Sequence, residues 1–284
     1  MKEPSISIVG PGRLGVALAT HLHSAGYRVS ELVAHHHVSP QVHRLAQALS
    51  ATATTLNSAE LKGKLVWLCV PDSRIEATAV ELASWEWKKR VVFHSSGVLT
   101  SDKLAVLKKA GASVASVHPL MTFVRKSVPS LRDVPFAIEG DPLAIRAARL
   151  AAKRVGGNPV IIRKQNKPAY HLFATLICPL LISLLAASEK AAMLAGLTPF
   201  EARIRMLPII RQTISNYQEL GAPGAFTGPF VRGDAETVRL QLKSLSRSPG
   251  IKAVYVSLAE AALQNLPHQR AHEIRSALRE SLQD

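Results

Sequence analysis

The sequence is poor in several residue types that specialised protein classes require. It has two cysteines, Cys69 and Cys178, in 284 residues. Each lies in an apolar stretch, so neither a disulfide framework nor a metal site is expected. Aromatic residues make up 5% of the chain, fewer than proteins that stack single-stranded nucleic acid bases usually need. The first residues, MKEPSISIVG, lack the apolar segment of a signal peptide, which indicates a cytoplasmic protein.

Acidic residues are also scarce. Asp and Glu total 20 against 35 Lys and Arg, which gives a formal net charge of +15. Such a surface attracts nucleotide phosphates, acidic substrates, nucleic acid or anionic lipid. The basic residues are scattered, and the tightest clusters, 88–90 and 163–164, are short. A basic solvated surface is therefore favoured over a nucleic-acid site, which stays as a lower-ranked alternative.

The first half of the chain alternates short apolar runs with helical patterns, which is typical of a doubly wound α/β domain with a mostly parallel sheet. The expected strands are 6–10, 29–34, 65–70, 90–94, 113–118, 136–140 and 159–163, and the expected helices between them are 13–25, 41–50, 74–84, 100–110 and 142–155. After residue 164 only helical patterns follow, with helix starts near Thr198, Asp234 and Ser248. We therefore predict a Rossmann-like dinucleotide-binding domain in 1–163 and an all-α domain of about five helices in 164–284.

A glycine-rich turn follows the first expected strand and opens the first helix. Its sequence, ISIVGPGRLG, has the spacing of a dinucleotide-binding turn, and the strand-turn-helix context makes the match specific. Gly10 would allow the turn, Gly12 the approach of a pyrophosphate, and Gly15 close packing of the helix on the sheet. A tight turn without ligand is the less favoured alternative. The predicted turn residues are Gly10, Pro11, Gly12, Arg13, Leu14 and Gly15.

The residues after the second strand favour NADP over NAD. A carboxylate there would bind the ribose 2′-hydroxyl of NAD and repel a 2′-phosphate. The strand ends LVAHHH, and no Asp or Glu occurs from Leu32 to Thr55. His35, His36 and Arg13 are the candidate phosphate ligands, although the histidines could equally be exposed loop residues, since histidine is largely neutral at pH 7.

Three other strand ends carry polar or rigid residues where an open α/β sheet binds its ligand. The sequence CVPD places Val70, Pro71 and Asp72 along the expected cofactor path. In HSSG and SVHPL, Ser95, Ser96 and His118 would lie beside the nicotinamide. Each alone could be ordinary turn chemistry.

The stretch KPAYHLFATLICPLLISLLAASEK opens with Lys167 and His171, which lie four residues apart on one helix face. A lysine at a helix start faces the positive end of the dipole, which lowers its proton affinity and suits acid–base or anion-binding work. An exposed helix start with no role is the alternative. The apolar residues that follow are sided, large on one face and small on the other, so a core helix bent at Pro179 is favoured over a membrane span.

The motifs HSSG, SVHPLMTF, KPAYH and TGPFVRGD resemble the bacterial family that joins a Rossmann-like domain to the domain of unknown function 2520. More broadly, the chain resembles the superfamily of 6-phosphogluconate dehydrogenase, ketopantoate reductase and pyrroline-5-carboxylate reductase. That resemblance implies an oxidoreductase fold with an all-helical second domain, usually dimeric. It also implies that Lys167 serves the chemistry together with the residue one turn later, here His171.

These observations lead to a first hypothesis of an NADP-dependent oxidoreductase. It would transfer a hydride to or from a small, anionic carbonyl, hydroxy or imine compound, with Lys167, His171, His118 and Ser96 as catalytic candidates. The helical domain would bind substrate and form a homodimer, with no membrane contact. A catalytically silent NADP-binding sensor or scaffold is the alternative.

Overall fold

The computed structural model describes residues 5–125 and 127–283. The chain forms two compact units, Met1–Leu176 and Ile177–Asp284. The helix Lys167–Ile177 belongs to the first unit for nearly all of its length, so its first turn can be described together with the sheet.

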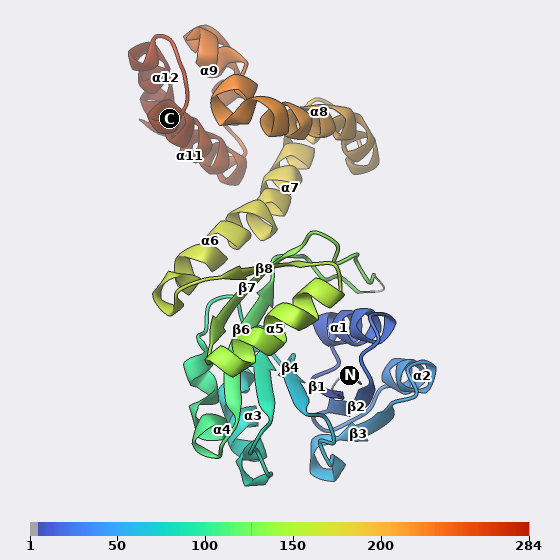
Figure 1. Ribbon diagram of the computed structural model, residues 1–284. Coiled ribbons are helices and arrows are strands. Elements are labelled where there is room, and N and C mark those ends of the chain that lie inside the picture. The colour runs from blue at the N-terminus through green and yellow to red at the C-terminus, as the bar shows by residue number, and fades with distance from the viewer. Residues whose placement is uncertain (1–4, 126, 284) are drawn as a thin grey trace. The chain divides into compact units, whose positions relative to one another are not determined.

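An eight-stranded sheet forms the centre of the first unit, in the order β3-β2-β1-β4-β5-β6-β7-β8 (Figure 1). The six strands from β3 to β6 run parallel, β7 is antiparallel to β6, and β8 is parallel to β7. Their bounds are β1 Ile6–Val9, β2 Val29–Ala34, β3 Thr52–Thr55, β4 Leu65–Leu68, β5 Val91–His94, β6 Ser113–Pro119, β7 Pro135–Gly140 and β8 Asn158–Ile161. The predicted doubly wound, mostly parallel sheet is confirmed.

Helices cover both faces of the sheet because successive strand residues point to opposite faces. In β4, Leu65 and Trp67 join the core under α1 (Arg13–Ser24), α2 (Pro40–Ala48) and α5 (Pro142–Arg154). Val66 and Leu68 join the core under α3 (Ile75–Glu81) and α4 (Ala105–Lys109). This double burial explains why the strands read as continuous apolar runs.

Strand β3 is the one strand of the described sheet that the sequence pattern did not predict. Its sequence, TATT, is polar and partly exposed, and it pairs only with β2 at the edge of the sheet. An edge strand with so little apolar content has no periodic signal to detect.

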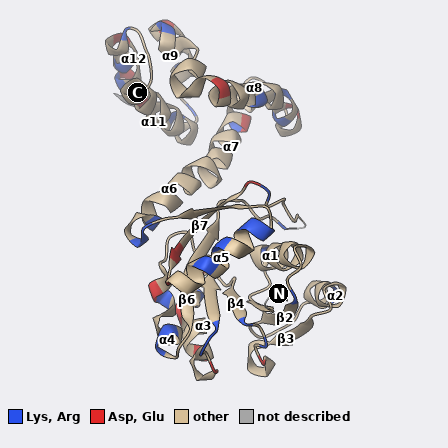
Figure 2. Ribbon diagram, viewed as in Figure 1, with Lys and Arg blue, Asp and Glu red and all other residues tan. Residues whose placement is uncertain are grey.

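The chain after residue 164 is helical, as predicted, but it has more helices than the five expected. In order these are α6 (Lys167–Ile177, in the first unit), α7 Pro179–Leu194, α8 Pro199–Ala225, α9 Pro229–Arg232, α10 Ala235–Ser244, α11 Pro249–Asn265 and α12 Ala271–Gln283. Thr198 caps α8 in a reciprocal bond with Glu201, and the Asp234 carboxylate caps α10 through the Thr237 N–H. Lys and Arg positions are spread over both units (Figure 2).

The single core helix expected after Lys167 is wrong in two respects. The backbone leaves helical geometry at Cys178, so Pro179 begins α7 instead of bending one long helix. Within the described chain, α7 has no buried residue and α6 has one, Lys167. Leucines on these helices are exposed, for example Leu172 at 57% and Leu180 at 48%.

The segment Lys164–Leu194 is long and apolar enough to cross a membrane by length and composition alone, which is weak evidence when only one such segment is found among the described residues. Many large apolar side chains on α6 and α7 are more than a third exposed among the described residues. The sequence pattern predicted an apolar face, but it could not tell what covers that face.

Candidate functional site

The glycine turn between β1 and α1 has the geometry that its spacing predicts. Gly10 has φ +85°, and a Cβ there would lie 2.9 Å from the Cys69 carbonyl carbon. At Gly15 a Cβ would lie 2.5 Å from the Gly10 carbonyl oxygen, so α1 packs directly on the turn. A Cβ at Gly12 would have no neighbour within 4 Å. The first N–H groups of α1, which have no partner within the helix, therefore face accessible space suited to a phosphate.

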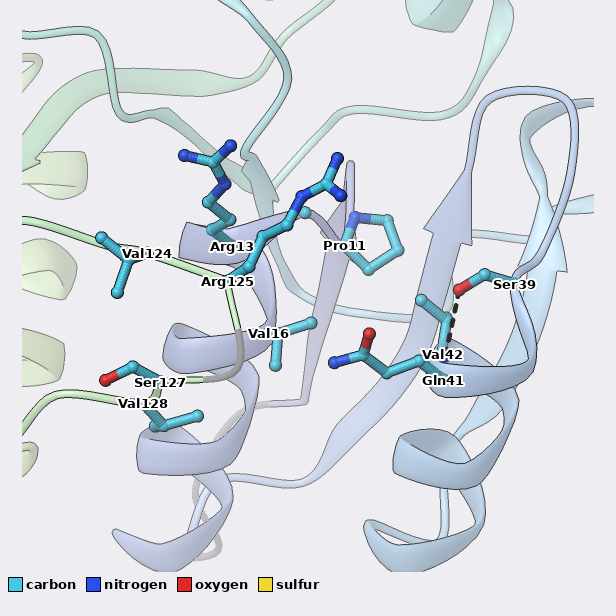
Figure 3. Close-up of a pocket in the computed structure, with 11 residues that line it drawn as sticks. Pro11, Arg13, Val16, Ser39, Gln41, Val42, Val124, Arg125, Ser127 and Val128 are labelled. Carbon is cyan, nitrogen blue, oxygen red and sulfur yellow. Dashed lines mark hydrogen bonds between the residues drawn. The ribbon is translucent and has the colours of Figure 1, made fainter.

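Two cavities adjoin at this turn. The first, of about 310 Å³, lies between the turn and the ends of β2 and β4. The second, of about 710 Å³, lies beside the starts of α1 and α2 and under the loop after β6 (Figure 3). Pro11, Gly12, Ser39 and Val42 line both cavities. The first cavity is also lined by Val9, Gly10, Ala34, His35, His37, Leu56, Cys69, Val70 and Pro71, and the second by Arg13, Val16, Gln41, Val124, Arg125, Ser127 and Val128.

The structure distributes the predicted cofactor residues unevenly. Gly10, Pro11, Gly12, Arg13, His35, Val70 and Pro71 line one cavity or the other, whereas Leu14, Gly15, His36, Asp72 and Ser95 are not among the lining residues. Sequence analysis missed Arg125 and Ser127, which follow β6 by several residues in a loop without periodicity. It also missed Ser39, whose place before a proline at a helix start could have identified it.

His35, the first candidate for a 2′-phosphate, is already engaged. Its Nε2 lies 2.8 Å from Nη2 of Arg74 and 3.2 Å from a Glu81 carboxylate oxygen. The His36 ring packs edge-on against the His35 ring, with centroids 3.9 Å apart. One nitrogen of His35, Nδ1, therefore stays available, beside a carboxylate that repels phosphate.

The acidic residue within β2, Glu31, has a structural role. Its buried carboxylate accepts hydrogen bonds from Ser7 Oγ at 2.7 Å and from the N–H groups of Leu61 at 3.1 Å and Lys62 at 2.7 Å. These bonds fix the loop before β4. The carboxylate is thus committed to that loop and is not a ribose ligand at the end of the strand.

The ends of β4 and β5 are joined through Ser96. Its hydroxyl donates to the Asp72 carboxylate at 2.7 Å and accepts from the N–H of Leu99 at 2.9 Å. In the same turn, the Ser95 hydroxyl accepts from the Trp67 indole at 2.7 Å. Both hydroxyls therefore hold the backbone of this turn in place.

His118 and His171 are both half-buried and lie side by side, and neither lines the two cavities described above. Nδ1 of His118 lies 3.1 Å from the Ser95 carbonyl oxygen and must donate to it, so the neutral ring presents Nε2 as an acceptor. The two ring centroids are 5.8 Å apart. Burial, together with the nearby Lys167 charge, lowers the pKa of His118 and favours the neutral ring. Both rings pack against Gly97, where a Cβ would lie 2.2 Å from Cδ2 of His171.

Lys167 is fully buried and is not among the residues that line the two cavities. Its ammonium donates to the Ser96 carbonyl at 3.0 Å and to Ser116 Oγ at 2.7 Å, which joins the ends of β5 and β6. Burial lowers its pKa to about 8, against the nearby charges of Glu139 and Asp72, which raise it. Lys167 therefore holds the turn that also carries the Ser95 carbonyl, the partner of His118.

His94, at the end of β5, completes the buried network. Its Nε2 donates to the Thr100 carbonyl at 3.0 Å, and its Nδ1 accepts from the Ser96 N–H at 3.2 Å. Burial lowers its pKa to about 4, so the ring is neutral at pH 7. Among the residues that the structure describes, no group of three or more His, Cys, Asp or Glu could hold a metal ion.

Two family models match the chain and together span most of it. A Rossmann-like domain matches residues 2–119, and the domain of unknown function DUF2520 matches residues 134–262. At the level of sequence, no curated protein matches the chain.

The fold is shared with solved reductase structures. A proposed NADP oxidoreductase from Bacteroides fragilis superposes with a TM-score of 0.78 and 21% identity, over 92% of this chain and 98% of its own. The reductive aminase of Aspergillus terreus, solved with NADPH and ethyl-5-oxohexanoate, has a TM-score of 0.64 and 14% identity, over 96% and 99%. An imine reductase from a Pseudomonas species has a TM-score of 0.62 and 18% identity, over 97% and 99%. At these identities the likeness establishes the fold.

Proposed function

Since the chain belongs to the proteins that join a Rossmann-like domain to a DUF2520 domain, we propose that it is an NADP-dependent oxidoreductase. The reaction is hydride transfer to or from a small, anionic carbonyl, hydroxy or imine compound. The similar folds of an NADP oxidoreductase, a reductive aminase and an imine reductase support this assignment.

The observation that carries the proposal is that the glycine turn and the histidine pair both lie at the carboxyl ends of the parallel strands. The turn follows β1, and Ser95 and His118 stand at the ends of β5 and β6. The strand order β1-β4-β5-β6 separates them by two or three strand spacings, about 10–14 Å. An extended dinucleotide with its pyrophosphate on the turn can cover that distance and bring its nicotinamide to the histidines.

We assign the proton transfer that accompanies hydride transfer to His171 and His118. Reduction of a carbonyl or imine needs a donor for the heteroatom, and the reverse reaction needs a base. In the reduction, His171 would donate the proton to the heteroatom of the substrate. In the reverse reaction, Nε2 of neutral His118 would accept the proton from the substrate. Lys167 and Ser96 act through the turn that they hold, as positioning residues.

The test is a screen of NADPH consumption against a panel of keto acids and imines, followed by His171→Ala on any substrate found. We expect turnover with NADPH, and a loss of about 100-fold or more in kcat with NADPH affinity unchanged, which is the usual contribution of a general acid. Tight NADPH binding without turnover of any compound would favour the sensor alternative. Full activity of His171→Ala would refute the assigned role.

The exposed apolar helices support the proposal of a homodimer. Contiguous apolar surface on a soluble protein usually marks an interaction site. A second copy of the chain is the partner that we propose for α6 and α7, because a symmetric dimer would bury the same apolar surface on both copies. We place this dimer in the cytoplasm. The alternative occupant, a lipid surface, is excluded if the protein stays in the supernatant when anionic vesicles are pelleted.

A further inference from the structure

We infer that the cavity between Arg13 and Arg125 holds the 2′-phosphate of the cofactor, and that Arg125 selects NADPH over NADH. The inference rests on the proposed function, since it assigns a subsite to the dinucleotide proposed there. It assigns the selection of NADPH over NADH to a loop that follows β6, and no longer to the histidines that follow β2.

The cavity has room for a phosphate monoester and polar groups that can bind one. Its volume is about 710 Å³, and its lining includes two guanidinium groups and the hydroxyls of Ser39 and Ser127. Figure 3 shows Arg125 reaching from the loop across the start of α1 toward Pro11, with Arg13 rising from the first turn of the same helix. Two guanidinium groups facing one space suit a dianion, because each can donate two parallel hydrogen bonds to phosphate oxygens.

The position of the cavity assigns it to the 2′-phosphate. It shares Pro11, Gly12, Ser39 and Val42 with the smaller cavity at the ends of β2 and β4. In a doubly wound fold the adenosine ribose lies at the end of the second strand, here Ala34 in the smaller cavity. A group on the ribose 2′-oxygen would then point across the shared wall into the cavity of Arg13 and Arg125.

Charge distinguishes this cavity from the histidine run. Among the described residues that line either cavity, none is acidic. Neither Arg13 nor Arg125 has an ion pair within the described chain, so their charges are available to a ligand. At His35, by contrast, Arg74 is neutralised by Glu81, whose carboxylate lies 3.4 Å away.

The loop that carries Arg125 is tied to α1. Nε2 of His21, on α1, lies 2.8 Å from the Pro129 carbonyl oxygen and donates a hydrogen bond to it. This bond fixes the far end of the loop on the helix whose first turn carries Arg13. The same loop and the same helix thus supply Arg125 and Arg13, which line one cavity.

The experiment compares NADPH and NADH binding to the full-length chain by titration calorimetry, for wild type, Arg125→Ala and Arg146→Ala. Arg146 is the matched control, because it is exposed on α5 and lines neither cavity. We expect Arg125→Ala to weaken NADPH binding by about 10–100-fold, as the loss of a charge-assisted pair predicts, and NADH binding by less than about threefold. Arg146→Ala should change neither.

The outcomes separate the inference from the proposed function. Wild type that binds NADPH tightly, with the same affinity in Arg125→Ala, overturns the inference alone. Equal weakening of NADPH and NADH also overturns it, because Arg125 would then contact a part common to both. Wild type that binds neither nucleotide overturns the proposed function and the inference with it. His35→Ala tests the alternative. If His35→Ala weakens NADPH binding selectively and Arg125→Ala does not, the histidines after β2 select NADPH over NADH.

Discussion

At the scale of single residues, the candidate site depends on Gly97 as much as on the histidines. The rings of His118 and His171 pack where a side chain at position 97 would stand. Only glycine leaves room for both rings at this close approach. The sequence motif HSSG was expected at the site, but its glycine was assigned no role, because ring packing across elements cannot be read from a single strand end.

Gly97→Ala is therefore expected to displace the His171 ring, since the new Cβ would lie 2.2 Å from Cδ2. We predict a loss in turnover of at least about 10-fold, part of the contribution that a general acid makes. NADPH affinity at the glycine turn should stay close to that of wild type. Gly250→Ala is the control, because a Cβ there has no neighbour within 4 Å. A fully active Gly97→Ala enzyme would contradict the packing described.

His94 gives the site a pH-dependent stability. Burial lowers the pKa of His94 in the folded protein to about 4, from the ordinary histidine value of 6.5. A histidine that is neutral when folded stabilises the protein above pH 6.5, and this contribution is lost as the pH falls toward 4, because the unfolded chain takes up the proton first. The full effect is about 3 kcal/mol.

We predict that His94→Gln reduces the loss of stability between pH 6.5 and pH 4 by about 3 kcal/mol relative to wild type. Glutamine can still donate to the Thr100 carbonyl and accept from the Ser96 N–H. Urea denaturation at both pH values measures the difference. Parallel stability curves for the two proteins would show that His94 does not titrate in this range.

At the scale of elements, α6 and α7 show what hydrophobic periodicity in a sequence cannot predict. The apolar pattern predicted one bent helix, where the structure has two that are separated at Cys178, and the four-residue spacing placed Lys167 and His171 on one helix face. The same pattern was assigned to a core, yet Leu172 and Leu180 are exposed. Hydrophobic periodicity identifies a face that must be covered, but it carries no information on whether the cover comes from the same chain.

Leu180→Glu tests whether α7 is covered by a second copy. We expect the variant to be monomeric under conditions where wild type is a dimer, because the substitution buries an unpaired charge in the interface. Glutamate in the first turn of α7 is compatible with the helix itself. Leu143→Glu on α5 is the matched control, since Leu143 is exposed to a similar extent, 45% against 48%. Light scattering measures the mass of each, and a monomeric wild type would contradict the proposal.

At the scale of the whole molecule, the sequence predicted the class of fold and the order of its parts. The βαβ rhythm and the glycine turn were sufficient for this, because each rests on local patterns that the fold requires. Of the proposed phosphate subsite, Arg13 was a candidate from the sequence, whereas Arg125 could not be predicted, because it comes from a loop whose residues meet the turn only after folding. The net charge of +15 is consistent with a protein that binds anionic ligands, and the Lys and Arg positions are spread over both units (Figure 2).

The most direct test of the account is a crystal structure of the protein with NADPH. We predict the pyrophosphate on the Gly10–Gly15 turn, the 2′-phosphate between Arg13 and Arg125, and the nicotinamide beside His118 and His171. The reactive carbon of the nicotinamide should face a space where a substrate could lie about 3–3.5 Å away, within reach of the histidines. A nucleotide bound elsewhere, or one whose nicotinamide points away from the histidine pair, would contradict the central claim.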